Sequence, residues 1–329
     1  MHGPLRVVAA ATGTVVLVAA CGGNEPSTTS AEDYPSEPLE VTVAFGPGGG
    51  SDIMARKIVE ILEQEDIYTE DIEVVNKDGG SGSQGWNYVK SQAGDPYQMS
   101  PTSGSFLTTP LEADTGWTYE DFTPVGLVAQ DDLLFAVAAD SGITTWEQWV
   151  DRAQEDTSGI AVGGIGTVNV DFINHSLLAE QAGYEISYVP FDEEAQLITG
   201  LLSGSLEAIV SNPAEVLGQV ESGDMNPLLF TGDEPLRSLP DVPTASDLGY
   251  EGMVSLPRGV ILAPDVPDEV QAWWIDAMEQ VIETPAWQEY LEQNQLNADV
   301  RWGDDFTSYL ESTSGTLEEE LSRLGALDG

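Results

Sequence analysis

The chain has 329 residues, which is enough for two domains of ordinary size. Its 57 acidic residues against 10 lysines and arginines give a formal net charge of −47, which repels phosphate groups and argues against a nucleic-acid partner. An apolar content of 41% is typical of a globular protein, so the acidity favours an exterior that stays hydrated in concentrated salt. A halophilic source is therefore one hypothesis, and a moderately acidic secreted protein is the alternative.

The first residues resemble a targeting segment. Arg6 precedes an apolar run that is too short for a comfortable membrane span, so residues 1–20 are predicted to be a signal peptide. Val18-Ala-Ala-Cys21 resembles a bacterial lipobox, in which the cysteine is acylated and becomes the new N-terminus; an ordinary signal peptide cut nearby is the alternative. Residues 21–38 are then a lipidated cysteine and a flexible tether.

A strand, a glycine turn and a helix follow one another where the globular region begins. Residues 41–45 are largely apolar and β-prone, Pro47 and three glycines break the strand, and a helical apolar pattern covers 53–62. Backbone N–H groups and the helix dipole make such a turn an anion cradle, although plain α/β architecture uses the same pattern. The turn lacks both the Gly-Lys-Ser/Thr of a P-loop and the spaced glycines of a dinucleotide-binding fold.

Residues 160–169 repeat this order of strand and glycine turn, and a helix with Phe172 and Leu177 on its apolar positions follows. Before it, residues 133–139 are continuously apolar and are predicted to form a buried strand at the first crossover between domains. Near the C-terminus, Trp273 and Trp274 belong to an apolar helical stripe, which we assign to packing.

Two motifs carry a family resemblance. Pro47-Gly-Gly-Gly-Ser-Asp52 and Leu239-Pro-Asp-Val-Pro-Thr244 are similar to motifs of the substrate-binding proteins of tripartite tricarboxylate transporters, the Bug family, and the similarity covers nearly the whole mature chain. The resemblance implies an α/β, two-lobed, periplasmic-binding-protein-like (type II) fold, in which each lobe is a mixed sheet flanked by helices and the ligand cleft lies between. We expect residues 39–137 and 257–329 to form domain I and residues 138–256 to form domain II.

The resemblance also implies a set of ligand-binding positions, carried mainly by glycine turns and hydroxyl groups of both lobes. These are Phe45, Gly48, Gly49, Gly50, Ser51, Asp52, Ser103, Gly104, Ser105, Gly164, Gly166, Thr167, Val168, Asn169, Phe191, Asn212 and Arg258. Where the family often has a glycine-rich or Lys-Gly turn, this chain has Asp192-Glu193-Glu194, which makes a direct anionic contact from those side chains doubtful. Arg258 either holds the ligand or the closed hinge, or makes a surface salt bridge.

The implied function is that of an extracytoplasmic, lipid-anchored solute-binding protein. It would capture a small di- or tricarboxylate by lobe closure, as a monomer, and deliver it to the transporter's membrane subunits. The alternative is a secreted hydrolase that acts on a small carboxylate ester through Ser51 or Ser103, but neither histidine is well placed to activate those hydroxyls. With Cys21 as the single cysteine and His2 and His175 as the two histidines, we expect no enzyme activity, no cofactor and no metal, and we interpret His175 as structural.

Overall fold

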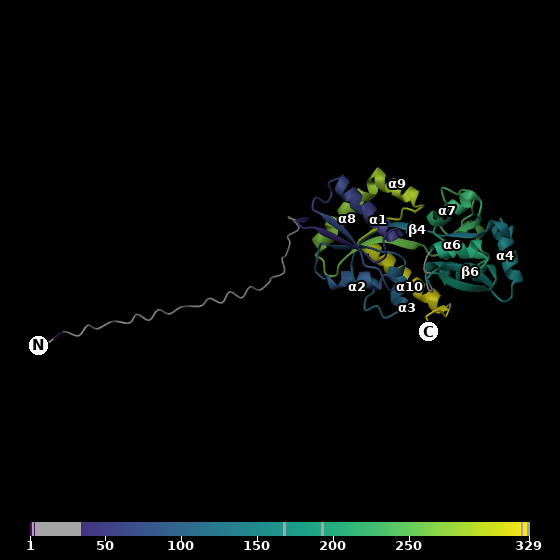
Figure 1. Cartoon of the computed structure of the whole chain (residues 1–329), viewed down its shortest axis with the longest axis horizontal. Helices are drawn as coiled ribbons and strands as arrows, with labels where there is room; N and C mark the ends of the chain where they lie inside the picture. Colours follow the sequence, from purple (N-terminus) through teal and green to yellow (C-terminus); the bar gives the residue numbers. More distant parts are fainter. Residues whose placement is uncertain (2, 4–33, 167–168, 192–193, 324, 328–329) are drawn as a thin grey trace. The chain divides into compact units, whose positions relative to one another are not determined.

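The computed structural model describes residues 1, 3, 34–166, 169–191, 194–323 and 325–327 (Figure 1). The expected signal peptide, Cys21 and most of the expected tether lie outside these ranges, as do Thr167 and Val168. Residues 35–329 form one unit, to which the following description applies. Across the described ranges, no helix combines the length and the apolarity that crossing a bilayer requires.

The first sheet is mixed and has six strands among the described residues, in the order β11-β4-β10-β3-β1-β2. β1 pairs in parallel with β2 and β3, whereas β10 is antiparallel to β3 and β4. The strands are β1 (Leu39–Val43), β2 (Ile72–Asn76), β3 (Gln98–Pro101), β4 (Thr123–Asp131), β10 (Leu256–Leu262) and β11 (Arg301–Trp302). β1, β3 and β10 are buried almost throughout, as expected for strands covered on both faces.

The second sheet, again counted over the described residues, has five strands in the order β7-β6-β8-β5-β9. β6 is parallel to β7 and β8, and β5 is antiparallel to β8 and β9. The strands are β5 (Leu134–Ala138), β6 (Ile160–Ile165), β7 (Ile186–Phe191), β8 (Ala208–Ser211) and β9 (Met225–Phe230). The α/β architecture with two mixed sheets is thus confirmed, and we call the sheets with their helices the first and second lobes.

The chain crosses from the first sheet to the second after β4 and returns before β10. Residues up to 137 were expected in domain I, but β5 pairs with β8 and β9 and therefore lies in the second sheet. The apolar run at 133–139 contains the predicted strand near the crossover, yet an apolar run alone does not identify the sheet that a strand joins.

Helices flank both sheets. In Figure 1, α1, α8 and α9 lie on one side of the first sheet, and α2, α3 and α10 lie on the other. The first lobe contains α1 (Gly50–Gln64), α2 (Ser83–Ser91), α3 (Ser105–Glu112), α8 (Asp268–Glu283), α9 (Pro285–Gln293) and α10 (Asp304–Arg323). The second contains α4 (Trp146–Glu155), α5 (Val170–Ala182), α6 (Glu194–Leu202) and α7 (Pro213–Ser222). Trp274 is fully buried, so its assignment to packing is confirmed.

Candidate functional site

A cavity of about 280 Å³ lies where helices of both lobes begin. Among the described residues, five helices have their first turn or N-cap at its wall: α1 and α3 from the first lobe, and α5, α6 and α7 from the second. The first N–H groups of a helix have no partner within the helix, and they carry the positive end of its dipole. The lining consists of Phe45, Gly49, Gly50, Ser51, Ser103, Gly104, Ser105, Ile165, Asn169, Asp171, Glu194, Asn212, Glu215, Leu256 and Arg258.

The first-lobe wall is built on the turn between β1 and α1. Gly48 has φ +87°, a conformation that favours glycine, and its N–H donates to Asp52 Oδ2 at 2.9 Å. Asp52 also accepts from Asn76 and forms an ion pair with Arg56. Burial alone would raise the pKa of Asp52, but the hydrogen bonds from Arg56, Gly48 and Asn76 hold it below its ordinary value. Asp52 therefore fixes the turn and does not face the cavity.

Gly50 lies where this turn contacts Arg258 of β10, the strand on which the chain returns to the first sheet. A Cβ at Gly50 would come within 2.8 Å of Arg258 Nη2, because the guanidinium lies directly against the glycine backbone. Space is even tighter at Gly104, which precedes α3, since a Cβ there would lie 2.2 Å from the Leu256 side chain. Both glycines thus allow the N-termini of first-lobe helices to approach β10 closely.

Arg258 lies on β10 and is buried, with 8% of its surface exposed. Its Nη2 donates to Asp131 Oδ2 at 2.6 Å, and Asn212 Nδ2 donates to the same oxygen at 2.7 Å. Although burial alone would lower the pKa of Arg258, the Asp131 carboxylate raises it above its ordinary value. The ion pair is therefore not a surface salt bridge: it is buried and joins β10 to β4 within the first sheet, and the Asn212 hydrogen bond connects it to the start of α7.

Two polar atoms at the cavity have no hydrogen-bond partner within the described part of the chain. They are the Ser103 hydroxyl oxygen and Arg258 Nε, and both atoms are buried. Buried polar groups are nearly always paired in native proteins, so both point to a bound water or ligand.

The second-lobe wall is acidic. Asp171, Glu194 and Glu215 lie in the first turns of α5, α6 and α7, respectively. Asp171 Oδ2 accepts from the Ile165 N–H at 2.7 Å, and Glu194 accepts from the Ser211 hydroxyl. Burial raises the pKa of Asp171 to about 8 despite that N–H bond, and burial likewise raises the pKa of Glu194 to about 7.

Most of the predicted site residues line this cavity, although they are spread over more than 200 positions of the sequence. The cavity brings together Phe45, Gly49, Gly50, Ser51, Ser103, Gly104, Ser105, Asn169, Asn212 and Arg258. Thr167 and Val168 lie outside the described residues.

Five predicted residues lie elsewhere, for reasons of packing. Gly48 and Asp52 hold the first turn together. A Cβ at Gly164 would come within 2.5 Å of the Asp171 side chain, so this glycine allows β6 and α5 to pack closely. Gly166 has φ +75° and accepts from the Tyr188 hydroxyl, and Phe191 packs against the core of the second lobe.

Sequence reasoning missed five lining residues: Ile165, Asp171, Glu194, Glu215 and Leu256. The missed acids share one signal, a carboxylate in the first turn of a helix. That signal usually marks only a favourable interaction with the helix dipole.

His175 does not line the cavity. It is fully buried in the second lobe with Nε2 at 3.0 Å from the Gly163 carbonyl oxygen, and burial lowers its pKa to about 4. Its structural role is therefore confirmed, and it cannot serve as the base for Ser51 or Ser103.

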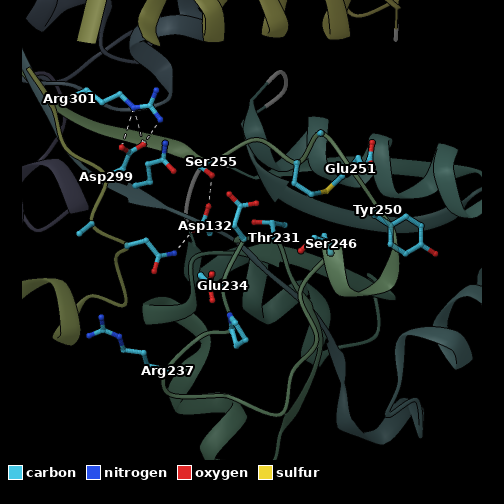
Figure 2. A pocket seen from close by; sticks show the side chains of 18 residues that line it. Asp132, Thr231, Glu234, Arg237, Ser246, Tyr250, Glu251, Ser255, Asp299 and Arg301 are labelled. Carbon is cyan, nitrogen blue, oxygen red and sulfur yellow. Dashed lines mark hydrogen bonds and ion pairs between the residues drawn. The ribbon is translucent and has the colours of Figure 1, made fainter. Parts of the chain in front are cut away.

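A larger pocket, of about 710 Å³, lies beside the crossing segments (Figure 2). At its centre Asp132 accepts hydrogen bonds from Ser255 and Asn297. Asp132 and Ser255 line this pocket, whereas Leu256 and Arg258 line the smaller cavity. Neighbouring side chains of an extended segment point to opposite sides, as Ser255 and Leu256 do here. The two cavities therefore lie on opposite sides of the segment that returns to the first lobe.

The comparisons with known proteins agree on one family. A family model described as "Tripartite tricarboxylate transporter family receptor" matches residues 54–316. Protein BugT of Bordetella pertussis is 25% identical over 257 residues, which cover 77% of this chain and 78% of BugT.

Solved structures show the same fold. Rpa4515 of R. palustris, in its structure with adipate, has a TM-score of 0.78 at 21% identity, over 89% of this chain and 99% of that one. MatC of Rhodopseudomonas palustris, with bound malate, has a TM-score of 0.69 at 20% identity, with the same coverage of both chains. The periplasmic binding protein BugD has a TM-score of 0.75 at 21% identity, again over 89% and 99%.

Proposed function

The chain belongs to the tripartite tricarboxylate transporter receptor family, and on that premise we propose that it captures a small organic carboxylate in the cavity between its lobes. The observation that carries the proposal is the convergence of helix N-termini on one cavity that also holds hydroxyl groups and Arg258. Backbone N–H groups at helix starts bind carboxylates without a net positive charge, which suits a chain with a formal charge of −47.

The size of the cavity fits this class of ligand. A volume of about 280 Å³ equals that of roughly nine water molecules at about 30 Å³ each. Adipate and malate, which are bound in the structures of two relatives, have a similar number of non-hydrogen atoms. We propose that the ligand spans the two lobes and that its binding free energy stabilises the closed form.

Calorimetric titration with succinate, malate, glutarate and adipate, together with aminocarboxylates of equal length, tests the proposal. We expect saturable binding of at least one compound, with the compound recovered chemically unchanged. A protein that binds none of these compounds would refute the proposal. Conversion of a carboxylate ester, abolished by Ser51→Ala or Ser103→Ala, would instead support the alternative of a secreted hydrolase.

We further propose that the receptor is monomeric and extracytoplasmic, that Cys21 is lipidated, and that the bound solute is delivered to the transporter's membrane subunits. The position of Cys21 after Val18-Ala-Ala and before a segment rich in Gly, Ser, Thr and Pro supports the anchor. We expect Cys21→Ser to release the protein from membranes or to leave it unprocessed, as followed by membrane fractionation and N-terminal mass spectrometry. Membrane retention of a fully cleaved serine variant would contradict lipidation.

A further inference from the structure

The two walls of the ligand cavity differ in charge. Within the described lining, the first lobe contributes glycines, serines, Phe45, Leu256 and one cation, Arg258. The acidic lining residues, Asp171, Glu194 and Glu215, come from the second lobe. The cavity is therefore polarised across the cleft, with N–H and O–H donors on one side and carboxylates on the other.

The first-lobe wall has the groups that a carboxylate requires. The N-termini of α1 and α3 present Gly50, Ser51 and Ser105. Asp52, the acid in the first turn of α1, is engaged by Arg56, Asn76 and the Gly48 N–H, and it does not line the cavity. Ser103 and Arg258, two lining residues of this wall, each have a buried polar atom, the hydroxyl oxygen and Nε respectively, with no hydrogen-bond partner among the described residues.

The second-lobe wall has the opposite property. Each of its three helix starts at the cavity already carries an acid, so the positive ends of these dipoles are compensated within the protein. The ion-pair partner of Arg258 is Asp131, and its interaction with Glu215 is a weaker coulombic one. A second ligand carboxylate against Glu194 and Glu215 would add like charge in a partly desolvated site, which is unfavourable.

A metal ion does not explain the acids, since no group of three or more His, Cys, Asp or Glu in the described chain is arranged to hold one. The single aromatic lining residue in the described set, Phe45, is on the opposite wall, so the acidic wall does not form an aromatic cage for a quaternary ammonium. The remaining complementary group is an ammonium that donates N–H bonds to carboxylates.

We propose that the preferred ligand is a zwitterion, an aminocarboxylate whose carboxylate binds the first-lobe wall and whose ammonium binds Glu194 and Glu215 of the second-lobe wall. This inference rests on the proposed function and specifies the chemical class of its solute. Asp171 is not assigned to the ammonium, because its carboxyl group is held by the Ile165 N–H and fixes the turn between β6 and α5.

Isothermal titration calorimetry at pH 8 on the mature protein, with 5-aminopentanoate and glutarate, tests the inference. The two compounds have chains of equal length and differ only in the group at one end. We expect 5-aminopentanoate to bind about tenfold more tightly or better, since a charge-assisted hydrogen bond replaces like-charge repulsion. A preference for glutarate would overturn the inference and leave the proposed function standing, whereas binding of neither compound would count against both.

The variant Glu215→Gln tests whether the second-lobe wall binds the ammonium group. Glu215 is exposed in the first turn of α7, so the variant is expected to fold. It should lose about tenfold in affinity for 5-aminopentanoate and should not lose affinity for glutarate. The matched control is Glu147→Gln, which removes an exposed acid from the first turn of α4 in the same lobe but away from the cavity. Equal effects of the two variants on 5-aminopentanoate would overturn the assignment of the ammonium to this wall.

Discussion

Asp52 and Asp171 occupy matching places in the first turns of α1 and α5, but their surroundings differ. Each accepts a backbone N–H from the glycine turn before its helix. Asp52 also has the cation Arg56, which helps to keep its pKa below the ordinary value against the effect of burial. Asp171 has no cation in contact among the described residues, and burial raises its pKa to about 8. The first aspartate is therefore stable as a carboxylate, whereas the second resists ionisation.

This difference predicts opposite effects of two Asp→Asn substitutions on the ligand-free protein. Because the pKa of Asp171 is raised, the folded protein binds a proton at this residue more tightly than the unfolded protein does. Its contribution therefore lowers wild-type stability as the pH rises from about 4 towards 8. Asp171→Asn should therefore raise the melting temperature, by more at pH 8 than at pH 5. Asp52 has a lowered pKa, so its stabilisation is fully present above the ordinary value of 3.8, and Asp52→Asn should lower the melting temperature at both pH values.

Differential scanning calorimetry of both variants at pH 5 and pH 8 checks this prediction. An advantage of Asp171→Asn that shrinks as the pH rises would show that Asp171 is an ordinary charged carboxylate in the folded protein.

At the scale of elements, the sequence predicted each strand–turn–helix unit but not how the units meet. Residues 41–62 have local signals for strand, turn and helix, and β1, the turn and α1 form there. Glu194 and Glu215 become neighbours of Asp171 only because β6 pairs with both β7 and β8, which places the starts of α5, α6 and α7 at one cavity. Strand order depends on long-range pairing, and a single acid after a strand does not encode it. The residues predicted from the sequence therefore gave both walls of the cavity similar neutral donors and left out the acids of the second lobe.

A hydrogen bond between the two lobes allows lobe closure to be tested. Asn212 precedes α7 in the second lobe and donates to Asp131 at the end of β4 in the first. Asn212→Ala should weaken this link and shift the ligand-free protein towards open forms, with a larger radius of gyration in small-angle X-ray scattering. Arg258→Ala is less informative, because it would leave Asp131 buried without its counter-ion, at a cost of about 3–5 kcal/mol.

The matched control for this prediction is Asn226→Ala. Asn226 donates a bond of equal length, 2.7 Å, to the Ile143 carbonyl oxygen, but both residues belong to the second lobe. If Asn212→Ala and Asn226→Ala give the same radius of gyration as the wild type, the Asn212 bond does not control the opening of the lobes.

At the scale of the whole molecule, the formal charge of −47 dominates the electrostatics. Like charges repel one another in the compact state, and salt screens this repulsion over about 8 Å at physiological ionic strength and over shorter distances at molar salt. We expect the melting temperature to rise between 0.1 M and 2 M KCl, and to rise similarly in tetramethylammonium chloride at equal ionic strength. A flat or falling melting temperature in KCl would argue against adaptation to high salt.

The turn at Gly50 and the guanidinium of Arg258 form one wall of the ligand cavity, and the affinity of two alanine variants tests whether this wall binds the ligand. Gly50→Ala places a Cβ within 2.8 Å of Arg258 Nη2, whereas a Cβ at Gly46, in the same turn, meets no atom within 4 Å. Calorimetric titration with 5-aminopentanoate and with the tightest-binding carboxylate of the panel should show a loss of about tenfold or more for Gly50→Ala. It should show wild-type affinity for Gly46→Ala, and both variants should have wild-type circular dichroism. Wild-type affinity of a folded Gly50→Ala protein for both compounds would show that this wall does not bind the ligand.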